Sequence, residues 1–210
     1  ISRHTNAFKI NEDVVIPLPR MAEYTDGIER INIELSLNNK IKLCDALHDF
    51  FAKGKLPLGK QDDANDIPSA ELLEDRVAQA LVLVTEVRNR WQGWLDGVAE
   101  QFRQLQDHSL RASWKSDLRA PLAAIFGGSA YKPIMDEVVA IHQRVLKGRV
   151  FVALHMHAGD GNVHTNLPVN SDDYEMLTTA HAAVARIMAL ARSLDGVISG
   201  EHGIGITKLE

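Results

Sequence analysis

The sequence predicts an α+β protein in which a ferredoxin-like, split βαβ antiparallel sheet is interrupted by a large inserted helical region. Three observations support this prediction. The 210-residue chain is 45% hydrophobic, which is enough for one or two domains with cores of their own. Short β-branched runs occur near both ends, whereas residues 36–130 have helical periodicity. Without that middle region, the elements follow the order strand, helix, strand, strand, helix, strand.

The first part of the predicted sheet domain comprises residues 1–35. A β-branched run at residues 14–16 ends at two prolines, so we expect a strand there. Residues 21–35 predict the helix that follows, with Gly27 as a weak point in it.

Residues 36–130 predict a helical insertion. Apolar residues recur there at alternating steps of four and three, in a heptad pattern that Arg88 interrupts. Such a pattern indicates a helical hairpin or a helix packed against a partner, and it favours core packing over a cofactor site. The residues of this stripe are Val77, Leu81, Val84, Trp91, Leu95, Val98, Phe102 and Leu105.

Residues 131–210 predict the remainder of the sheet domain. After a helix, the segments "GRVFVALHMH" and "NVHTNLPV" are strands joined by the turn signal "AGDG", so we expect a hairpin. The next helix begins with the capping-box pair Asp172 and Glu175 and ends at Gly196. The segment "VISGEHGIGITK" predicts a last strand that runs into a glycine-rich turn.

The predicted hairpin contains three histidines, His155, His157 and His164. If the strands pair with His157 opposite His164, then His155, His157, His164 and Asn166 share one face, because opposed residues and their i±2 neighbours point the same way. Apolar side chains then occupy the other face, where a core can cover them. Directly opposed strand residues have Cβ atoms about 4.5–5.5 Å apart, and two imidazoles at this separation can bind one divalent ion. A His-x6-His pair alone is more often accidental, but the neighbouring motifs favour a metal site.

The glycines around the hairpin suit a ligand site. Gly159 and Gly161 can adopt positive φ beside Asp160, which we interpret as a turn former. A third ligand is expected from "SGEHG", because two imidazoles and one carboxylate form a common catalytic set with positions left for substrate. Adjacent strand residues point in opposite directions, so we assign Glu201 to the metal and His202 to the substrate.

The bulk composition excludes some classes of function. The net charge of -5, with no Lys/Arg-rich run, gives no basis for nucleic-acid binding. No apolar stretch approaches the roughly 18 residues that a membrane span needs. The single cysteine, Cys44, excludes an internal disulfide and fits a reducing compartment, so a cytoplasmic location is expected.

Two motifs together point to a family. "HAGDGNVHTN" followed by "GVISGEHGIGITK" closely resembles the C-terminal domain of FAD-linked 2-hydroxy-acid dehydrogenases and oxidases of the vanillyl-alcohol oxidase type. D-lactate dehydrogenase, the glycolate oxidase catalytic subunit and D-2-hydroxyglutarate dehydrogenase belong to this family. "EDVVIPLPRMAEY" resembles the opening of the same domain, and the helical middle resembles an insertion of very large members.

The resemblance implies the roles of the candidate residues. His157, His164 and Glu201 would bind a divalent metal. Zinc is the expected ion, and iron and manganese are the alternatives. His202 would take the hydroxyl proton of a D-2-hydroxy acid while its C2 hydride passes to FAD, which yields the 2-oxo acid. The substrate would be bound by Asn166, Arg3 and Lys9.

The resemblance also implies partners. FAD would be bound mainly by a separate N-terminal domain, which we expect to be absent because no glycine-rich pyrophosphate loop precedes the first strand. The chain is therefore expected to be a piece of a larger enzyme, inactive without its flavin domain. An iron–sulfur domain, or a quinone or cytochrome acceptor, would receive electrons, and the full-length protein would lie in the cytoplasm or peripherally at the inner membrane. The alternative is a non-catalytic metal-binding or protein-interaction module that uses the heptad-patterned helices.

Overall fold

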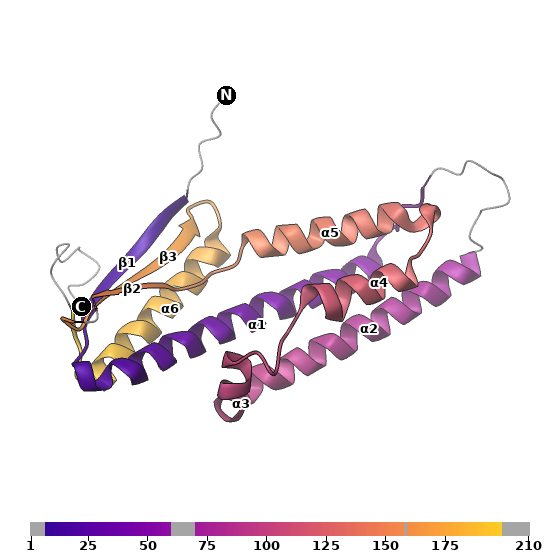
Figure 1. The fold of residues 1–210 in the computed structure, drawn as a ribbon. Helices are drawn as coiled ribbons and strands as arrows, with labels where there is room; N and C mark the ends of the chain where they lie inside the picture. The colour runs from indigo at the N-terminus through magenta and orange to yellow at the C-terminus, as the bar shows by residue number, and fades with distance from the viewer. Residues whose placement is uncertain (1–6, 60–69, 158, 199–210) are drawn as a thin grey trace. The chain divides into compact units, whose positions relative to one another are not determined.

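The computed structural model describes residues 7–59, 70–157 and 159–198, and Figure 1 shows its elements. They are, in chain order, β1 (Ala7–Val15), α1 (Met21–Lys53), α2 (Ala70–Asp96), α3 (Val98–Gln106), α4 (Ala120–Ile125), α5 (Lys132–Lys147), β2 (Ala153–His157), β3 (Asn162–Asn170), α6 (Tyr174–Ser193) and β4 (Val197–Ile198). A π-helical segment, Trp114–Arg119, precedes α4.

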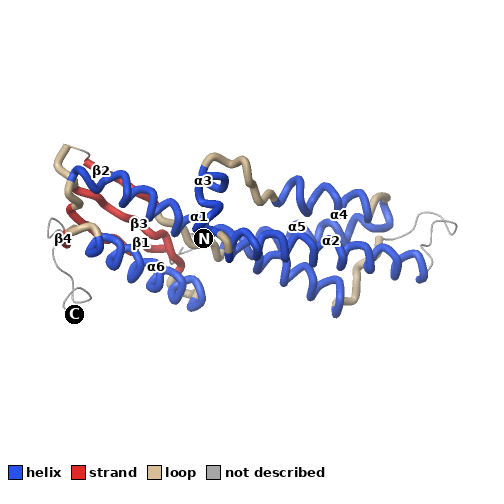
Figure 2. The backbone as a smooth tube through the Cα atoms, turned by 90° about the horizontal axis from the view of Figure 1, so that it is seen from below, coloured by secondary structure: helices blue, strands red, loops and turns tan. Residues whose placement is uncertain are grey.

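The chain divides into two compact units. A sheet unit comprises Ile1–Ser36 and Gly148–Glu210, and a helical unit comprises Leu37–Lys147. Figure 2 shows that the strands all belong to the sheet unit, whereas the helical unit consists of helices and their connections. The helical unit includes α5, which the sequence analysis grouped with the sheet domain from residue 131 onwards.

The sheet has the strand order β2-β3-β1-β4, and every neighbouring pair is antiparallel. The α+β class predicted from the sequence is therefore confirmed. Strand β3 lies between β2 and β1. This is the order expected of a split βαβ unit, in which a third strand separates the two strands that the first helix connects. The finer ferredoxin-like description stays a prediction.

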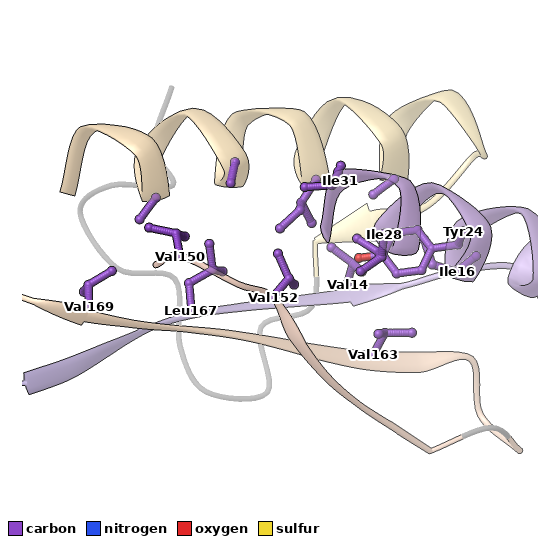
Figure 3. Packing of buried hydrophobic residues seen from close by; sticks show 14 of the residues in the cluster. Val14, Ile16, Tyr24, Ile28, Ile31, Val150, Val152, Val163, Leu167 and Val169 are labelled. Atoms are coloured by element: carbon purple, nitrogen blue, oxygen red, sulfur yellow. The ribbon is translucent and has the colours of Figure 1, made fainter. Parts of the chain in front are cut away.

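One face of the sheet carries the core of this unit. Along β3, Val163, Leu167 and Val169 are buried, and they alternate with His164 and Asn166, which are only partly buried. The buried side chains pack against α1 and α6 (Figure 3). Since successive strand residues point to opposite faces, the residues between them point to the other face of the sheet.

Helix α1 approaches α6 closely at Gly27. A Cβ at this position would run into the side chain of Leu190 on α6, so the absence of a side chain allows the two helices to pack together. The predicted weak point in the helix is therefore a packing contact. Helix α1 also continues unbroken to Lys53, beyond the end at residue 35 that the sequence predicted.

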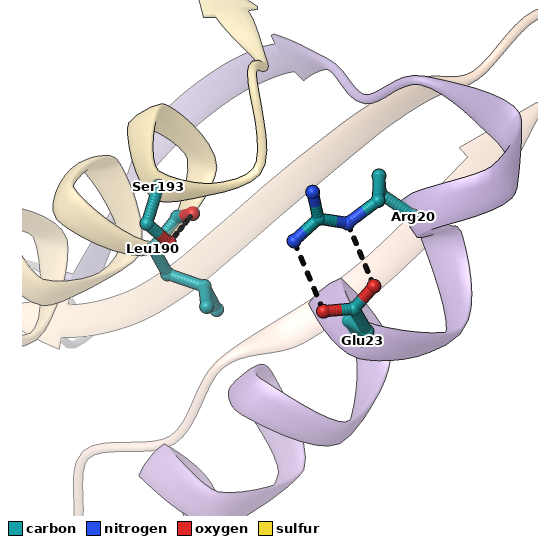
Figure 4. Close-up of polar contacts among 4 residues, drawn as sticks. All are labelled: Arg20, Glu23, Leu190 and Ser193. Carbon is teal, nitrogen blue, oxygen red and sulfur yellow. Dashed lines mark hydrogen bonds and ion pairs between the residues drawn. The ribbon is translucent and has the colours of Figure 1, made fainter.

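Polar side-chain contacts lie where the chain enters α1 and where it leaves α6. Arg20 donates two hydrogen bonds to the carboxylate of Glu23, at 2.6 and 3.0 Å, where the chain enters α1 (Figure 4). The Ser193 hydroxyl donates to the carbonyl of Leu190 at 2.7 Å at the end of α6. An exposed ion pair such as Arg20–Glu23 contributes little to stability, so these contacts shape the turns more than they stabilise the fold.

Strand β2 begins at Ala153, later than the sequence predicted. The side chain of Asn32 on α1 accepts a hydrogen bond from the backbone N–H of Val152 at 2.7 Å and donates one to its carbonyl at 2.8 Å. A side-chain amide therefore takes the place of a neighbouring strand at Val152. The same contact ties α1 to the strand that carries His155 and His157.

Helix α6 is capped one residue later than predicted. The side chain of Asp173 accepts a hydrogen bond from the backbone N–H of Met176 at 2.9 Å. The assignment of the cap to Asp172 was wrong, because Asp172 lies in the turn before the helix, where its N–H donates to the Asn170 side chain. The helix itself is confirmed.

The helical unit has a core of its own. Within it, the buried ring of Phe51 on α1 stacks on Phe126 with ring centroids 5.4 Å apart. Asp45 on α1 and Arg88 on α2 form an exposed ion pair at 2.6 Å. The predicted apolar stripe is broken at Gly97, between α2 and α3. Its buried members are Val84, Trp91, Val98 and Leu105. Because these residues pack inside the unit, the heptad pattern does not by itself require a partner protein.

Within the described part of the chain, no helix combines the length and the apolar character needed to span a bilayer. Cys44, the one cysteine of the sequence, is buried in the helical unit.

Candidate functional site

The predicted histidine face exists, although its register differs from the prediction. The cross-strand pairs are His155 with His164, His157 with Asn162, and Ala153 with Asn166. The prediction that His157 lies opposite His164 was therefore wrong by two residues, because β3 already begins at Asn162, which lies opposite His157. A shift of two residues preserves the side-chain alternation, so the prediction of one shared face for the three histidines and Asn166 is confirmed.

The three imidazole rings lie close together on this face. The ring centroids are 5.4 Å apart for His155 and His157, 5.6 Å for His157 and His164, and 6.2 Å for His155 and His164. Two imidazoles that bind one tetrahedral ion through nitrogen have centroids about 5 Å apart. The described residues by themselves contain no group of three or more His, Cys, Asp or Glu arranged to hold a metal. The predicted third ligand, Glu201, lies outside the described residues.

Strand β1 adds a carboxylate that the sequence analysis missed. Asp13 lies opposite His164 in the register of β1 and β3, and its Oδ1 is 2.8 Å from Nδ1 of His164. Asp13 is only 3% exposed. The sequence contained a signal for it, namely an acidic residue directly beside the β-branched run of the first strand. The partner of that carboxylate depends on tertiary pairing and is not visible in the sequence.

The proposed substrate residues fall partly on this face. Asn166 is half-buried and lies opposite Asn11 on β1 and Ala153 on β2. Lys9 is exposed, lies opposite Pro168 and shares the face of Asp13 and His164. It is four residues from Asp13, or about 13 Å along an extended strand. The remaining predicted site residues, Arg3, Glu201 and His202, lie outside the described residues.

The turn of the hairpin depends on one glycine. Gly161 has a φ of 70°, as the sequence predicted. A Cβ at Gly161 would meet the carbonyl oxygen of Ile16, but a Cβ at Gly159 would meet nothing within 4 Å. The backbone N–H of Asp160 donates to the carbonyl of His157 at 3.0 Å, which agrees with the interpretation of Asp160 as a turn former.

Comparisons with known proteins match the part of the chain that contains this hairpin. Residues 131–210 match the family model of the C-terminal domain of FAD-linked oxidases. The chain is 36% identical over 52 residues to the probable mitochondrial D-lactate dehydrogenase of Danio rerio, over 25% of this chain. It is 33% identical over 75 residues to glycolate oxidase subunit GlcD of Bacillus subtilis, over 36% of this chain. It is 50% identical over 54 residues to D-lactate dehydrogenase of Archaeoglobus fulgidus, over 25% of this chain.

These matches cover 10%, 16% and 11% of the lengths of the three relatives, in that order. No solved structure matches the chain significantly. The family match contains the hairpin with His155, His157 and His164 and the segment with Glu201 and His202. The C-terminal part of this chain, residues 131–210, therefore belongs to the family of FAD-linked oxidase C-terminal domains.

Proposed function

We propose that the sheet unit is the substrate- and metal-binding domain of a flavin-dependent dehydrogenase that oxidises a D-2-hydroxy acid, such as lactate, glycolate or 2-hydroxyglutarate, to the 2-oxo acid. The observation that carries the proposal is the pair His157 and His164, which lie on one face with ring centroids 5.6 Å apart. Both belong to the part of the chain that matches the FAD-linked oxidase family.

A divalent metal fits the side chains of this face. His157 and His164 supply imidazole nitrogens, and Glu201 would supply a carboxylate, a donor set that suits zinc and also iron or manganese. The Nδ1 of His164 faces Asp13, so Nε2 is the nitrogen of that ring placed to bind the ion. A bound ion would lower the pKa of the substrate's hydroxyl and neutralise charge on its carboxylate.

The other side chains would bind and orient the substrate. Asn166 shares the face of the histidines and offers both a donor and an acceptor for the hydroxyl or the carboxylate. Lys9 and Arg3 would provide positive charge for the carboxylate, and His202 would accept the hydroxyl proton. FAD would supply the hydride acceptor, held by an FAD-binding domain outside this chain.

Metal content is the first test of this proposal. The 210-residue chain, purified and supplied with zinc or manganese, should contain about one ion per chain by elemental analysis. His157→Ala, His164→Ala and Glu201→Ala should each lose it, because each removes one ligand. His181→Ala, which replaces an exposed histidine on α6, is the matched control and should retain the ion. A well-folded chain that binds neither metal would overturn the metal assignment.

Activity is tested in a protein that joins this chain to an FAD-binding domain. We expect reduction of the flavin by D-lactate, glycolate or D-2-hydroxyglutarate, and strong loss of this reduction in His202→Ala. Quinone, cytochrome and iron–sulfur acceptors can then be compared by the rate at which the flavin is reoxidised. Fractionation of cells that produce the longer protein distinguishes a cytoplasmic location from peripheral attachment to the inner membrane. No flavin reduction with any of the three acids would contradict the proposed substrate class.

A further inference from the structure

We infer that Asp13 is a positioning residue that holds His164 in the tautomer and orientation required to bind a metal. The inference rests on the metal site proposed above. Asp13 Oδ1 lies 2.8 Å from His164 Nδ1, within hydrogen-bond distance. The two residues are directly opposed on neighbouring central strands, although they are 151 positions apart in the chain.

The burial of Asp13 indicates a role beyond packing. Its side chain is 4% exposed, and that of His164 is 14% exposed. A carboxylate withdrawn from water is unfavourable unless it accepts hydrogen bonds or meets a positive charge. An apolar residue would fill the same position in a β-sheet without this penalty. The carboxylate therefore lies beside His164, the histidine that β3 contributes to the histidine face, within hydrogen-bond distance of its ring.

The direction of the hydrogen bond determines which nitrogen of His164 can bind a cation. An ionised carboxylate only accepts hydrogen bonds, so Nδ1 of His164 must carry the proton. In a neutral imidazole, the lone pair is then on Nε2. A carboxylate bonded to the remote nitrogen of a histidine ligand also makes the ring a stronger donor, and its loss typically lowers metal affinity by about 10- to 100-fold.

Two substitutions separate this role from a simple ion pair. Asp13→Ala removes the acceptor, whereas Asp13→Asn retains an oxygen that accepts from Nδ1–H but carries no charge. Asp160→Asn is the matched control, because Asp160 is an exposed carboxylate in the turn of the same hairpin. We expect zinc affinity to fall by about 10- to 100-fold in Asp13→Ala, to fall less in Asp13→Asn because the retained oxygen still orients the ring, and to be unchanged in Asp160→Asn.

The experiment uses the whole 210-residue chain. Zinc affinity is measured by competition with a chromophoric chelator, and the visible absorption of the cobalt-substituted protein reports the ligand geometry. Thermal unfolding without metal shows whether each variant folds. The tautomer of His164 is read from the imidazole nitrogen shifts of the metal-free wild-type chain by NMR, which does not depend on any variant.

The outcomes are distinct. The Nδ1–H tautomer in the wild-type chain, with weakened zinc binding and an altered cobalt spectrum in Asp13→Ala, supports the inference. A folded Asp13→Ala that binds zinc as the wild type does overturns it, as does the Nε2–H tautomer, while the proposed function stands. A wild-type chain that binds no metal removes the metal site and this inference together.

Discussion

The backbone N–H of Ile16 donates a hydrogen bond to the carbonyl of Gly161 at 2.8 Å, and this bond joins the turn of the histidine hairpin to the end of β1. Gly161 follows Asp160 in the turn, and Ile16 follows directly after the strand that holds Asp13. The bond therefore couples the position of His157 and His164 to the strand whose carboxylate contacts His164.

Gly161→Ala should destabilise the sheet unit and weaken metal binding. The positive φ of Gly161 is strained for any residue with a Cβ, and this Cβ would also displace the Ile16 carbonyl. We expect a loss of about 1–3 kcal/mol in the free energy of unfolding, measured by chemical denaturation. Gly159→Ala, where the added Cβ meets nothing within 4 Å, is the matched control and should unfold as the wild type does. Equal effects of the two substitutions would contradict this account of the turn.

Asn32→Ala should loosen the start of β2. The substitution removes both hydrogen bonds between the Asn32 side chain and the backbone of Val152 and leaves two partly buried groups unsatisfied. We expect a destabilisation of about 1–3 kcal/mol and faster amide exchange along β2. Asn39→Ala is the comparison, because it removes a side-chain bond to the Val145 carbonyl in the helical unit. If exchange along β2 were equally slow in both variants, Asn32 would not determine where the strand begins.

His142 should make the stability of the helical unit depend on pH. Its ring stacks on Trp114 with centroids 4.2 Å apart, and burial, assisted by Arg119, lowers its pKa below the ordinary value of 6.5. The unfolded chain then binds more protons than the folded chain as the pH falls through 6.5. The stability that this group contributes is fully present above that pH and is lost as the pH falls toward the folded pKa. His142→Phe, which retains a ring for stacking, should flatten this dependence in thermal unfolding curves. Identical curves for the two proteins would show that another group is responsible.

Cys44 should be unreactive in the folded protein. Burial is the main cause that raises the pKa of its thiol to about 12, so almost none of the reactive thiolate is present at neutral pH. We expect no labelling by iodoacetamide in the native chain and complete labelling after denaturation, measured by mass spectrometry of the intact protein. Rapid labelling of the native chain would mean that the packing around Cys44 opens frequently.

Local patterns in the sequence were sufficient for the histidine face. Polar and apolar residues alternate along both strands of the hairpin, and this alternation predicted which side chains share a face. The prediction held even though the assumed register was wrong by two residues. Side-chain direction has a period of two, so an error of two leaves the faces unchanged. The turn also contacts Ile16, which is distant in sequence, and a pattern within the hairpin does not reveal that contact.

Helix bounds were less predictable for a similar reason. Gly27 was interpreted as a weak point from its intrinsic propensity, yet the contact with Leu190 makes its small size an advantage. The predicted cap Asp172 and the true cap Asp173 are adjacent acidic residues, so composition alone does not distinguish them. Only the path of the preceding turn decides which one faces the first N–H groups of the helix.

The sequence by itself determined the α+β class, the collection of His155, His157, His164 and Asn166 on one face, and the motifs that place residues 131–210 in their family. These follow from periodicity and from motifs within short segments. The tertiary structure alone decided that Asp13 meets His164 across 151 positions of chain, that Asn32 binds the backbone before β2, and that α1 continues through the predicted boundary. Contacts of this kind depend on which surfaces pack together, and the burial of apolar area that selects the packing is a property of the whole fold.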